Sequence, residues 1–220
     1  MLFDLFGTLI APYRYNEHQV CVAAAATILG VDAASCTQHW ADTWQQRACG
    51  AFPTVEENLR VMAPTASEEQ LREAGLLYTE FTFDSLRPKP GAVELLDELR
   101  ARGLRVGLLS NAAPDVPRLW SRTAFADRFD ALVFSCDIGT MKPRPEAYLI
   151  ALVRLGTTAV DTWFVGDGSD DELSAARAVG LHAVLVDNDL TNTYDADRPD
   201  VLAWDGPRVT DLLELLALLD

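Results

Sequence analysis

The first side chain able to act as a nucleophile is the carboxylate of Asp4. It lies in an apolar run, LFDLF, which is followed directly by Gly7 and Thr8. A carboxylate among apolar residues is costly unless a cation or several hydrogen-bond donors satisfy it. Amides of a Gly-Thr turn can hold an anion beside that carboxylate, so the pattern favours a reactive aspartate over a structural one. The hydroxyl of Thr8 fits either the same site or a plain turn.

Two later segments place polar side chains beside apolar runs. Ser110 and Asn111 end the segment LRVGLLSN, where a hydroxyl and a backbone amide can bind an oxyanion or cap the next helix. Lys142 lies in the loop GTMKPRPEAY, which two prolines stiffen. A lysine beside several carboxylates can neutralise a site and hold an anionic substrate.

An acidic cluster, GDGSDDEL at 166–173, follows an apolar run and precedes a helical pattern. Asp167 and Asp171 are four residues apart, and Asp170 and Glu172 add further charge. Such acidity within one turn is costly without a cation, and hard carboxylate oxygens suit Mg²⁺. Acids also favour helix N-termini, a role that we assign chiefly to Asp170 or Glu172.

Strands and helices alternate along most of the chain. From residue 91 on, amphipathic helical patterns separate apolar runs that are typical of buried strands: LRVGLLS, ALVFS, TWFVG and LHAVLVD. This order predicts an α/β fold with a doubly wound, mostly parallel sheet. Ligands bind at the carboxyl ends of the strands in such sheets. The candidate residues lie at these ends, so we expect them to converge on one crevice.

Residues 11–87 differ from the rest, because they show helical periodicity and almost no strand pattern. The Pro- and Gly-rich segment RPKPG ends this part of the chain. We therefore expect a core of residues 1–10 and 88–220 and an inserted helical domain of residues 11–87. The core should also contain a short helix near 115–122, a polar loop at 188–200 and a final helix at 208–219.

Four segments resemble, in order, the four motifs of the haloacid dehalogenase (HAD) superfamily: FDLFGTL, LLSNA, the lysine of MKPRPEAY, and VGDGSDDEL. The resemblance covers residues 1–10 and about 88–187. It implies a Rossmann-like core and a hydrolase, and residues 11–87 lie where members carry a helical, C1-type cap.

The resemblance also implies a role for each candidate. Asp4 would be the nucleophile, and Asp4, Asp167 and the backbone carbonyl of Phe6 would bind Mg²⁺. Asp171 would support the metal shell. Ser110 and Lys142 would hold the transferred phosphoryl group, and Thr8 and Asn111 complete the expected catalytic set.

One position departs from the phosphatases of this superfamily, which usually have a second aspartate two residues after the nucleophile. Here that position is Phe6, which cannot move a proton, so acid/base catalysis worth about 10²–10⁴-fold is lost. An aromatic residue there resembles the 2-haloacid dehalogenases, and Tyr148 fits that pattern or a packing role. The metal-independent dehalogenases carry Ser and Asn near Asp167 and Gly168, whereas Asp-Gly fits a metal site.

The composition limits the partners. The formal net charge of −15 argues against nucleic acid and anionic membranes, and a site for an anionic substrate must then be made locally positive. No run of ~18 apolar residues predicts a membrane span, and the N-terminus lacks the basic region of a signal peptide. The scattered cysteines and histidines form no zinc pattern, which favours a reducing cytoplasm.

These observations together predict a Mg²⁺-dependent phosphatase acting on a small phosphate ester through an aspartyl-phosphate. A 2-haloacid dehalogenase is one alternative, since it attacks carbon with the same carboxylate. A HAD fold retained for binding, with weak or no turnover, is another, because Phe6 replaces the usual acid/base.

Overall fold

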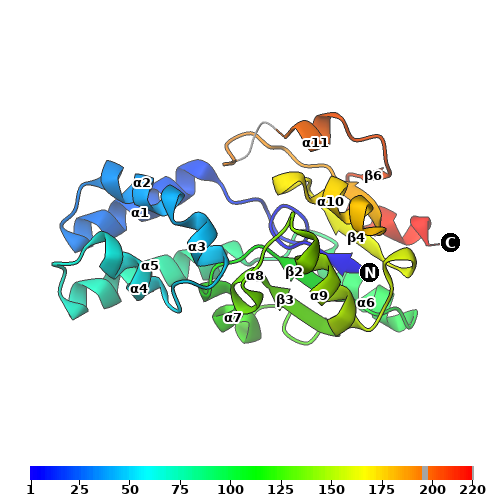
Figure 1. The fold of residues 1–220 in the computed structure, drawn as a ribbon, viewed down its shortest axis with the longest axis horizontal. Coiled ribbons are helices and arrows are strands. Elements are labelled where there is room, and N and C mark those ends of the chain that lie inside the picture. Colours follow the sequence, from blue (N-terminus) through cyan, green and yellow to red (C-terminus); the bar gives the residue numbers. More distant parts are fainter. Residues whose placement is uncertain (195–197, 220) are drawn as a thin grey trace.

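The computed structural model describes residues 1–194 and 198–219, and a parallel sheet with helices around it forms the part that contains both termini (Figure 1). Its strands follow the order β3-β2-β1-β4-β5-β6, and each neighbouring pair is parallel. The predicted α/β fold is therefore confirmed. The strands are β1 (Leu2–Phe3), β2 (Gly107–Ser110), β3 (Ala131–Phe134), β4 (Trp163–Gly166), β5 (His182–Val186) and β6 (Arg208–Val209).

The order in which strands are added to the sheet changes direction at β1. From β1 the chain builds β2 and β3 on one side, and later returns to build β4, β5 and β6 on the other. In open parallel sheets, a crevice forms at the carboxyl ends of the strands at this position. The ends of β1 and β4 are therefore the expected place for a site.

Helices cover both faces of the sheet, which explains why the strands read as continuous apolar runs. In β2, Leu108 packs into the cluster on one face and Leu109 into the cluster on the other. The first cluster includes residues of α6 (Ala92–Ala101), α7 (Asp115–Leu119), η1 (Trp120–Arg122) and η4 (Leu212–Leu218). The second includes residues of α9 (Pro145–Leu155), α10 (Glu172–Val179) and α11 (Pro199–Leu202). The remaining short helices are α8 (Ser135–Ile138), η2 (Ala159–Asp161) and η3 (Ser169–Asp171).

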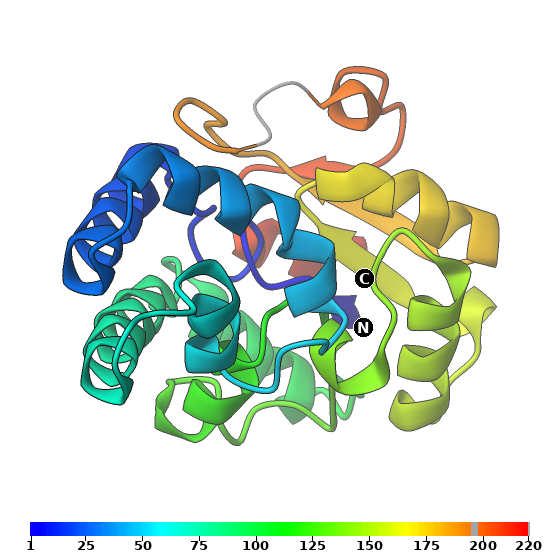
Figure 2. The same cartoon turned by 60° about the vertical axis from the view of Figure 1, so that its left-hand side comes forward.

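The segment between β1 and α6 forms a helical unit beside the carboxyl ends of the strands (Figures 1 and 2). Its helices are α1 (Tyr15–Leu29), α2 (Ala33–Asp42), α3 (Trp44–Ala48), α4 (Val55–Met62) and α5 (Glu68–Ser85). Side chains of Asp32, Thr54 and Ser67 cap α2, α4 and α5 by accepting a backbone N–H, which explains where these helices begin. The unit has its own apolar cluster, formed largely by α1, α2 and α5.

The C-terminal part of the core differs from the sequence prediction of a helix over 208–219. Arg208 and Val209 form β6, which pairs with the end of β5. The side chain of Asp211 then accepts the N–H of Leu213 at 2.8 Å, so the helical turns of η4 begin only at Leu212. Of the polar loop expected at 188–200, residues 195–197 lie outside the described part of the chain, and Pro199 begins α11.

Among the described residues, no single helix is long and apolar enough to cross a membrane. One bent pair, α1 with α2 at 116°, meets the length and composition limits when the two are taken together.

Candidate active site

The ends of β1 and β4 bring two carboxylates together. The backbone N–H of Asp4 donates to the carbonyl of Val165 at 2.9 Å, which extends the pairing of β1 with β4 by one residue. Asp167 follows β4 in the same way, so both side chains emerge at adjacent strand ends. A Cβ atom on Gly7, whose φ is +79°, would lie 1.8 Å from Oδ2 of Asp167. Glycine is therefore needed at this turn for conformation and for space.

Lys142 lies between two buried carboxylates. Its Nζ is 2.5 Å from Oδ1 of Asp4 and 2.5 Å from Oε2 of Glu172, and the lysine side chain is 2% exposed. Asn111 fixes the lysine backbone, because its Oδ1 accepts the N–H of Lys142 at 2.8 Å and its Nδ2 donates to the Lys142 carbonyl at 3.0 Å. These two hydrogen bonds fix the backbone of Lys142.

The charges of this cluster shift the pKa values of its members. Burial raises the pKa of Asp4, which Lys142 opposes and Asp167 reinforces. Burial also raises the pKa of Glu172 well above its usual range. Burial alone lowers the pKa of Lys142, but Asp4 and Glu172 outweigh that effect and raise it. The lysine therefore stays charged. One ammonium group does not balance the charge of two buried carboxylates, so a further cation would be favoured here.

The sequence predicts that Asp171 supports the metal, but the structure buries Glu172 beside the other carboxylates instead. Glu172 is fully buried, and its Oε1 accepts the N–H of Gly168 at 3.0 Å while Oε2 faces Lys142. Asp171 is exposed and has a left-handed backbone (φ 54°), so its side chain lies outside the buried group. Asp170 has the same left-handed backbone (φ 53°), and after these two residues it is the side chain of Glu172 that faces inward. Asp170 accepts a hydrogen bond from Asn111 at 3.1 Å.

Asp167 is held by two further residues. Its Oδ1 accepts the backbone N–H of Ser169 at 3.1 Å and the Ser169 hydroxyl at 2.8 Å. Its Oδ2 pairs with Nη1 of Arg198 at 2.7 Å, and Arg198 is 5% exposed. The sequence analysis does not identify Arg198, and it assigns Glu172 to helix capping rather than to the buried site. Arg198 lies in a polar loop without a motif, so no local signal marks it.

Three oxygen atoms at the strand ends are buried without a hydrogen-bond partner among the described residues. They are Oδ2 of Asp4, the hydroxyl of Thr8 and the hydroxyl of Ser110. A buried polar atom without a partner costs about 1–3 kcal/mol, so a bound ligand would stabilise all three. These are three of the residues predicted as catalytic, and each belongs to a strand end or the turn after it.

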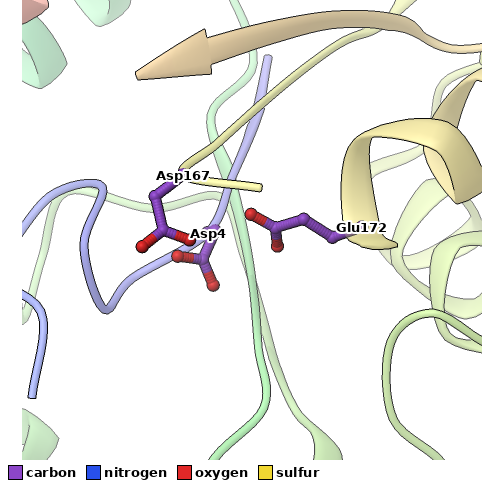
Figure 3. A group of neighbouring side chains, drawn as sticks. All are labelled: Asp4, Asp167 and Glu172. Carbon is purple, nitrogen blue, oxygen red and sulfur yellow. The ribbon is translucent and has the colours of Figure 1, made fainter. Parts of the chain in front are cut away.

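The carboxylates also suit a divalent metal ion. One oxygen from each of Asp4, Asp167 and Glu172 lies within 4.8 Å of the others, and all three side chains are buried (Figure 3). Oδ2 of Asp4, which has no partner in the described part of the chain, provides a hard ligand atom. The residues present therefore fit Mg²⁺. Asp4 and Asp167, which the sequence predicts as metal ligands, both belong to this group.

Phe6 connects the site to the helical unit. Its ring packs on Tyr13 with centroids 5.2 Å apart, and Tyr13 packs on His18 and Phe81. Tyr148, in contrast, is fully buried and donates from its hydroxyl to the carbonyl of Glu172 at 2.8 Å, which is a positioning contact.

The turn after Asp4 has a second support that the sequence did not predict. Nζ of Lys89 donates to the carbonyl of Gly7 at 2.5 Å, and Nδ2 of Asn188 donates to the same oxygen at 2.6 Å. The side chains of Lys89 and Asn188 also contact each other. This half-buried lysine adds positive charge near Asp4 and Asp167 in a chain that is acidic overall.

Comparison with known proteins identifies relatives over most of the chain. A family model described as haloacid dehalogenase-like hydrolase matches residues 1–180. A phosphoglycolate phosphatase from Salmonella typhi is 31% identical over 237 aligned residues, which cover 98% of this chain and 91% of that protein. A phosphoserine phosphatase from Thermus thermophilus is 33% identical over 127 residues, or 57% of this chain and 49% of that protein, so the match spans about half of that relative.

Solved structures share the fold. A 2-haloacid dehalogenase from Pseudomonas syringae pv. Tomato DC3000 superposes with a TM-score of 0.70 at 24% identity, covering 99% of this chain and 96% of that one. A HAD phosphatase from Thermococcus onnurineus superposes with a TM-score of 0.67 at 21% identity and the same coverage. At these identities the likeness concerns the fold alone.

Proposed function

The chain belongs to the haloacid dehalogenase-like hydrolase family, and from this premise we propose that it hydrolyses a small phosphate ester in a Mg²⁺-dependent reaction, through an aspartyl-phosphate on Asp4. One observation carries the proposal. The buried carboxylate of Asp4 has one oxygen on Lys142, while its other oxygen is buried without a partner among the described side chains. Such an oxygen is available for a metal ion or for attack on an electrophile.

The roles follow from the positions of the side chains. Asp4 is the nucleophile, and Lys142, Ser110 and Thr8 hold the phosphoryl group. The hydroxyls of Ser110 and Thr8 have no hydrogen-bond partner within residues 1–194 and 198–219, so they are available for this role. Asn111 positions Lys142 through both backbone hydrogen bonds.

The metal would be held by Asp4, Asp167 and the backbone carbonyl of Phe6. Glu172 takes the supporting role that we had expected of Asp171, because it is the buried acid beside Lys142. When bound, Mg²⁺ would neutralise charge on the phosphoryl oxygens and on these carboxylates.

In the proposed reaction a carboxylate oxygen of Asp4 attacks phosphorus, and the bond from phosphorus to the ester oxygen breaks. Water then attacks the same phosphorus, releasing inorganic phosphate and restoring the Asp4 carboxylate. Lys142 stays protonated throughout, since both neighbouring carboxylates raise its pKa. Phe6 supplies no proton, so the departing oxygen takes its proton from water and the reaction favours good leaving groups.

The helical unit is proposed to act as the cap. In this division the cap domain consists of residues 11–87, and the core consists of residues 1–10 and 88–220. Its contact with the site runs through Tyr13, whose ring packs on Phe6. Aromatic side chains so close to the nucleophile would shape the space for the leaving group.

A second candidate is a 2-haloacid dehalogenase, which Phe6 favours. In that reaction Asp4 would attack a carbon atom and displace a halide, without a metal. The acid cluster fits this reaction less well, because three buried carboxylates that lie close together suit a cation, which the dehalogenase reaction does not use.

The experiment is a substrate panel with purified protein, with Mg²⁺ and with chelator. It contains phosphoglycolate, phosphoserine, p-nitrophenyl phosphate and 2-chloropropionate. We expect Mg²⁺-dependent phosphate release that Asp4→Asn abolishes, while the exposed matched variant Asp171→Asn keeps most of it. Halide release in the presence of chelator, without phosphate release, would replace the proposal with the second candidate. Binding of phosphate without any turnover would show a fold retained for binding.

A further inference from the structure

Arg198 is a buried cation that binds the proposed metal ligand Asp167. Its Nη1 lies 2.7 Å from Oδ2 of Asp167 and donates to the Asp167 backbone carbonyl at 3.0 Å. Both side chains are nearly inaccessible, at 5% and 2% exposed. Little water lies between the two charges, so solvent screens their attraction only weakly.

The two proposed metal ligands differ in how their oxygens are used. Both oxygens of Asp167 are occupied, Oδ1 by Ser169 and Oδ2 by Arg198. Asp4, in contrast, keeps Oδ2 without a partner among the described residues. A divalent ion that binds both aspartates therefore meets a free oxygen on one and an oxygen already paired with a guanidinium on the other.

The fold places Arg198 at Asp167 through α11. The methyl carbon Cγ2 of Val201 lies 2.4 Å from the position that a Cβ on Gly168 would take, so α11 packs directly on the loop after Asp167. The carbonyl of Arg198 accepts the N–H groups of Val201 and Leu202, both at 3.1 Å. These bonds hold the Arg198 backbone through main-chain atoms, independently of its guanidinium group.

We propose that Arg198 is an internal counter-ion that competes with the divalent metal for Asp167. This inference rests on the metal site of the proposed function. In the metal-free protein the guanidinium neutralises Asp167, and metal binding has to displace it from Oδ2 or bind beside it against charge repulsion. Removing the guanidinium should therefore tighten metal binding.

The test is calorimetric titration with Mn²⁺ and Mg²⁺, without any substrate, on the full chain. The variants are Arg198→Met and Arg198→Gln, the second keeping a polar side chain in case methionine disturbs folding. The control is Arg177→Met on α10, which removes the same charge from a surface pair, since Arg177 lies 2.6 Å from Asp205 and is 40% exposed. Thermal unfolding without metal confirms that each variant is folded.

We expect both Arg198 variants to bind metal at least about tenfold more tightly than the wild type, and Arg177→Met to stay within about twofold. Tightening by Arg177→Met to the same extent would show a general charge effect and overturn the inference. Unchanged or weaker binding by the Arg198 variants would also overturn it, because Arg198 would then only hold Asp167 in position. In either case metal binding by the wild type would leave the proposed function standing, whereas no metal binding by any protein would remove both.

Discussion

Replacing Lys142 by methionine removes the ammonium that Asp4 and Glu172 share. The lysine is 2% exposed and lies 2.5 Å from an oxygen of each carboxylate, so the variant leaves two acids buried together without their cation. Breaking a buried ion pair by removing one partner costs about 3–5 kcal/mol. We expect a loss of that size in the free energy of unfolding at pH 8, together with loss of turnover.

The sign of the pH dependence follows from the same contacts. Burial already raises the pKa of Asp4 and of Glu172, and loss of the lysine removes the contact that opposes this. Groups with a raised folded pKa take up protons more readily in the folded state, so their stability contribution is present at low pH and is lost as the pH rises. The deficit of Lys142→Met should therefore be smaller at pH 5 than at pH 8.

Denaturant unfolding at pH 5 and pH 8 measures the free energy that Lys142→Met loses. Two further variants are compared with it. The double variant Lys142→Met/Glu172→Gln should recover part of the stability but none of the activity, because one buried charge is gone. Arg60→Met breaks an ion pair with Glu68 in which both side chains are well exposed, and should leave the free energy of unfolding nearly unchanged. A Lys142→Met protein as stable as the wild type at pH 8, or a deficit that grows at pH 5, would refute the reasoning.

Three further outcomes are expected. Excess EDTA should abolish phosphate release and added Mg²⁺ should restore it; full activity with EDTA would exclude the metal site. Wild-type rates should be much higher for aryl than for alkyl phosphates, and Phe6→Asp should raise the alkyl rate if the variant stays folded; equal wild-type rates would mean that another group supplies the proton. Burial, and to a smaller extent the charge of Arg47, lowers the pKa of His18 from 6.5 to about 4. Between pH 7 and pH 4 the histidine therefore takes up a proton mainly in the unfolded state, which should lower the free energy of unfolding by about 3 kcal/mol. His18→Gln should lack that part of the loss in unfolding measurements, and an unchanged slope would contradict it.

The sequence predicted the parts of the site that depend on strand ends. Asp4, Ser110 and Asp167 each follow an apolar run, and in a parallel sheet the carboxyl ends of the runs meet at one edge. Lys142 could be added because its loop follows the apolar run ALVFS by a few residues, and the structure places its Nζ beside Oδ1 of Asp4. The positions of these residues follow from the order of strands in the sheet, and the strands themselves can be recognised from local sequence patterns.

The remaining residues depend on loop geometry and on distant contacts. Whether Asp171 or Glu172 faces inward depends on two left-handed residues, Asp170 and Asp171, and such backbone conformations leave little trace in an acidic run. Arg198 reaches Asp167 only because α11 packs on Gly168, a contact between segments about 30 residues apart. The short β6 was hidden because two residues beside a leucine-rich segment read as part of one helix.

Trapping the intermediate on Asp4 tests the proposed chemistry most directly. The protein is mixed with Mg²⁺ and an aryl phosphate, quenched in acid within one turnover, and treated with borohydride, which reduces an aspartyl-phosphate to homoserine. Peptide mass spectrometry should then find homoserine at position 4, in a Mg²⁺-dependent manner and absent from Asp4→Asn. Turnover of the phosphate ester with Asp4 unmodified, or with the phosphoryl group trapped on another side chain, would contradict a nucleophilic role for Asp4.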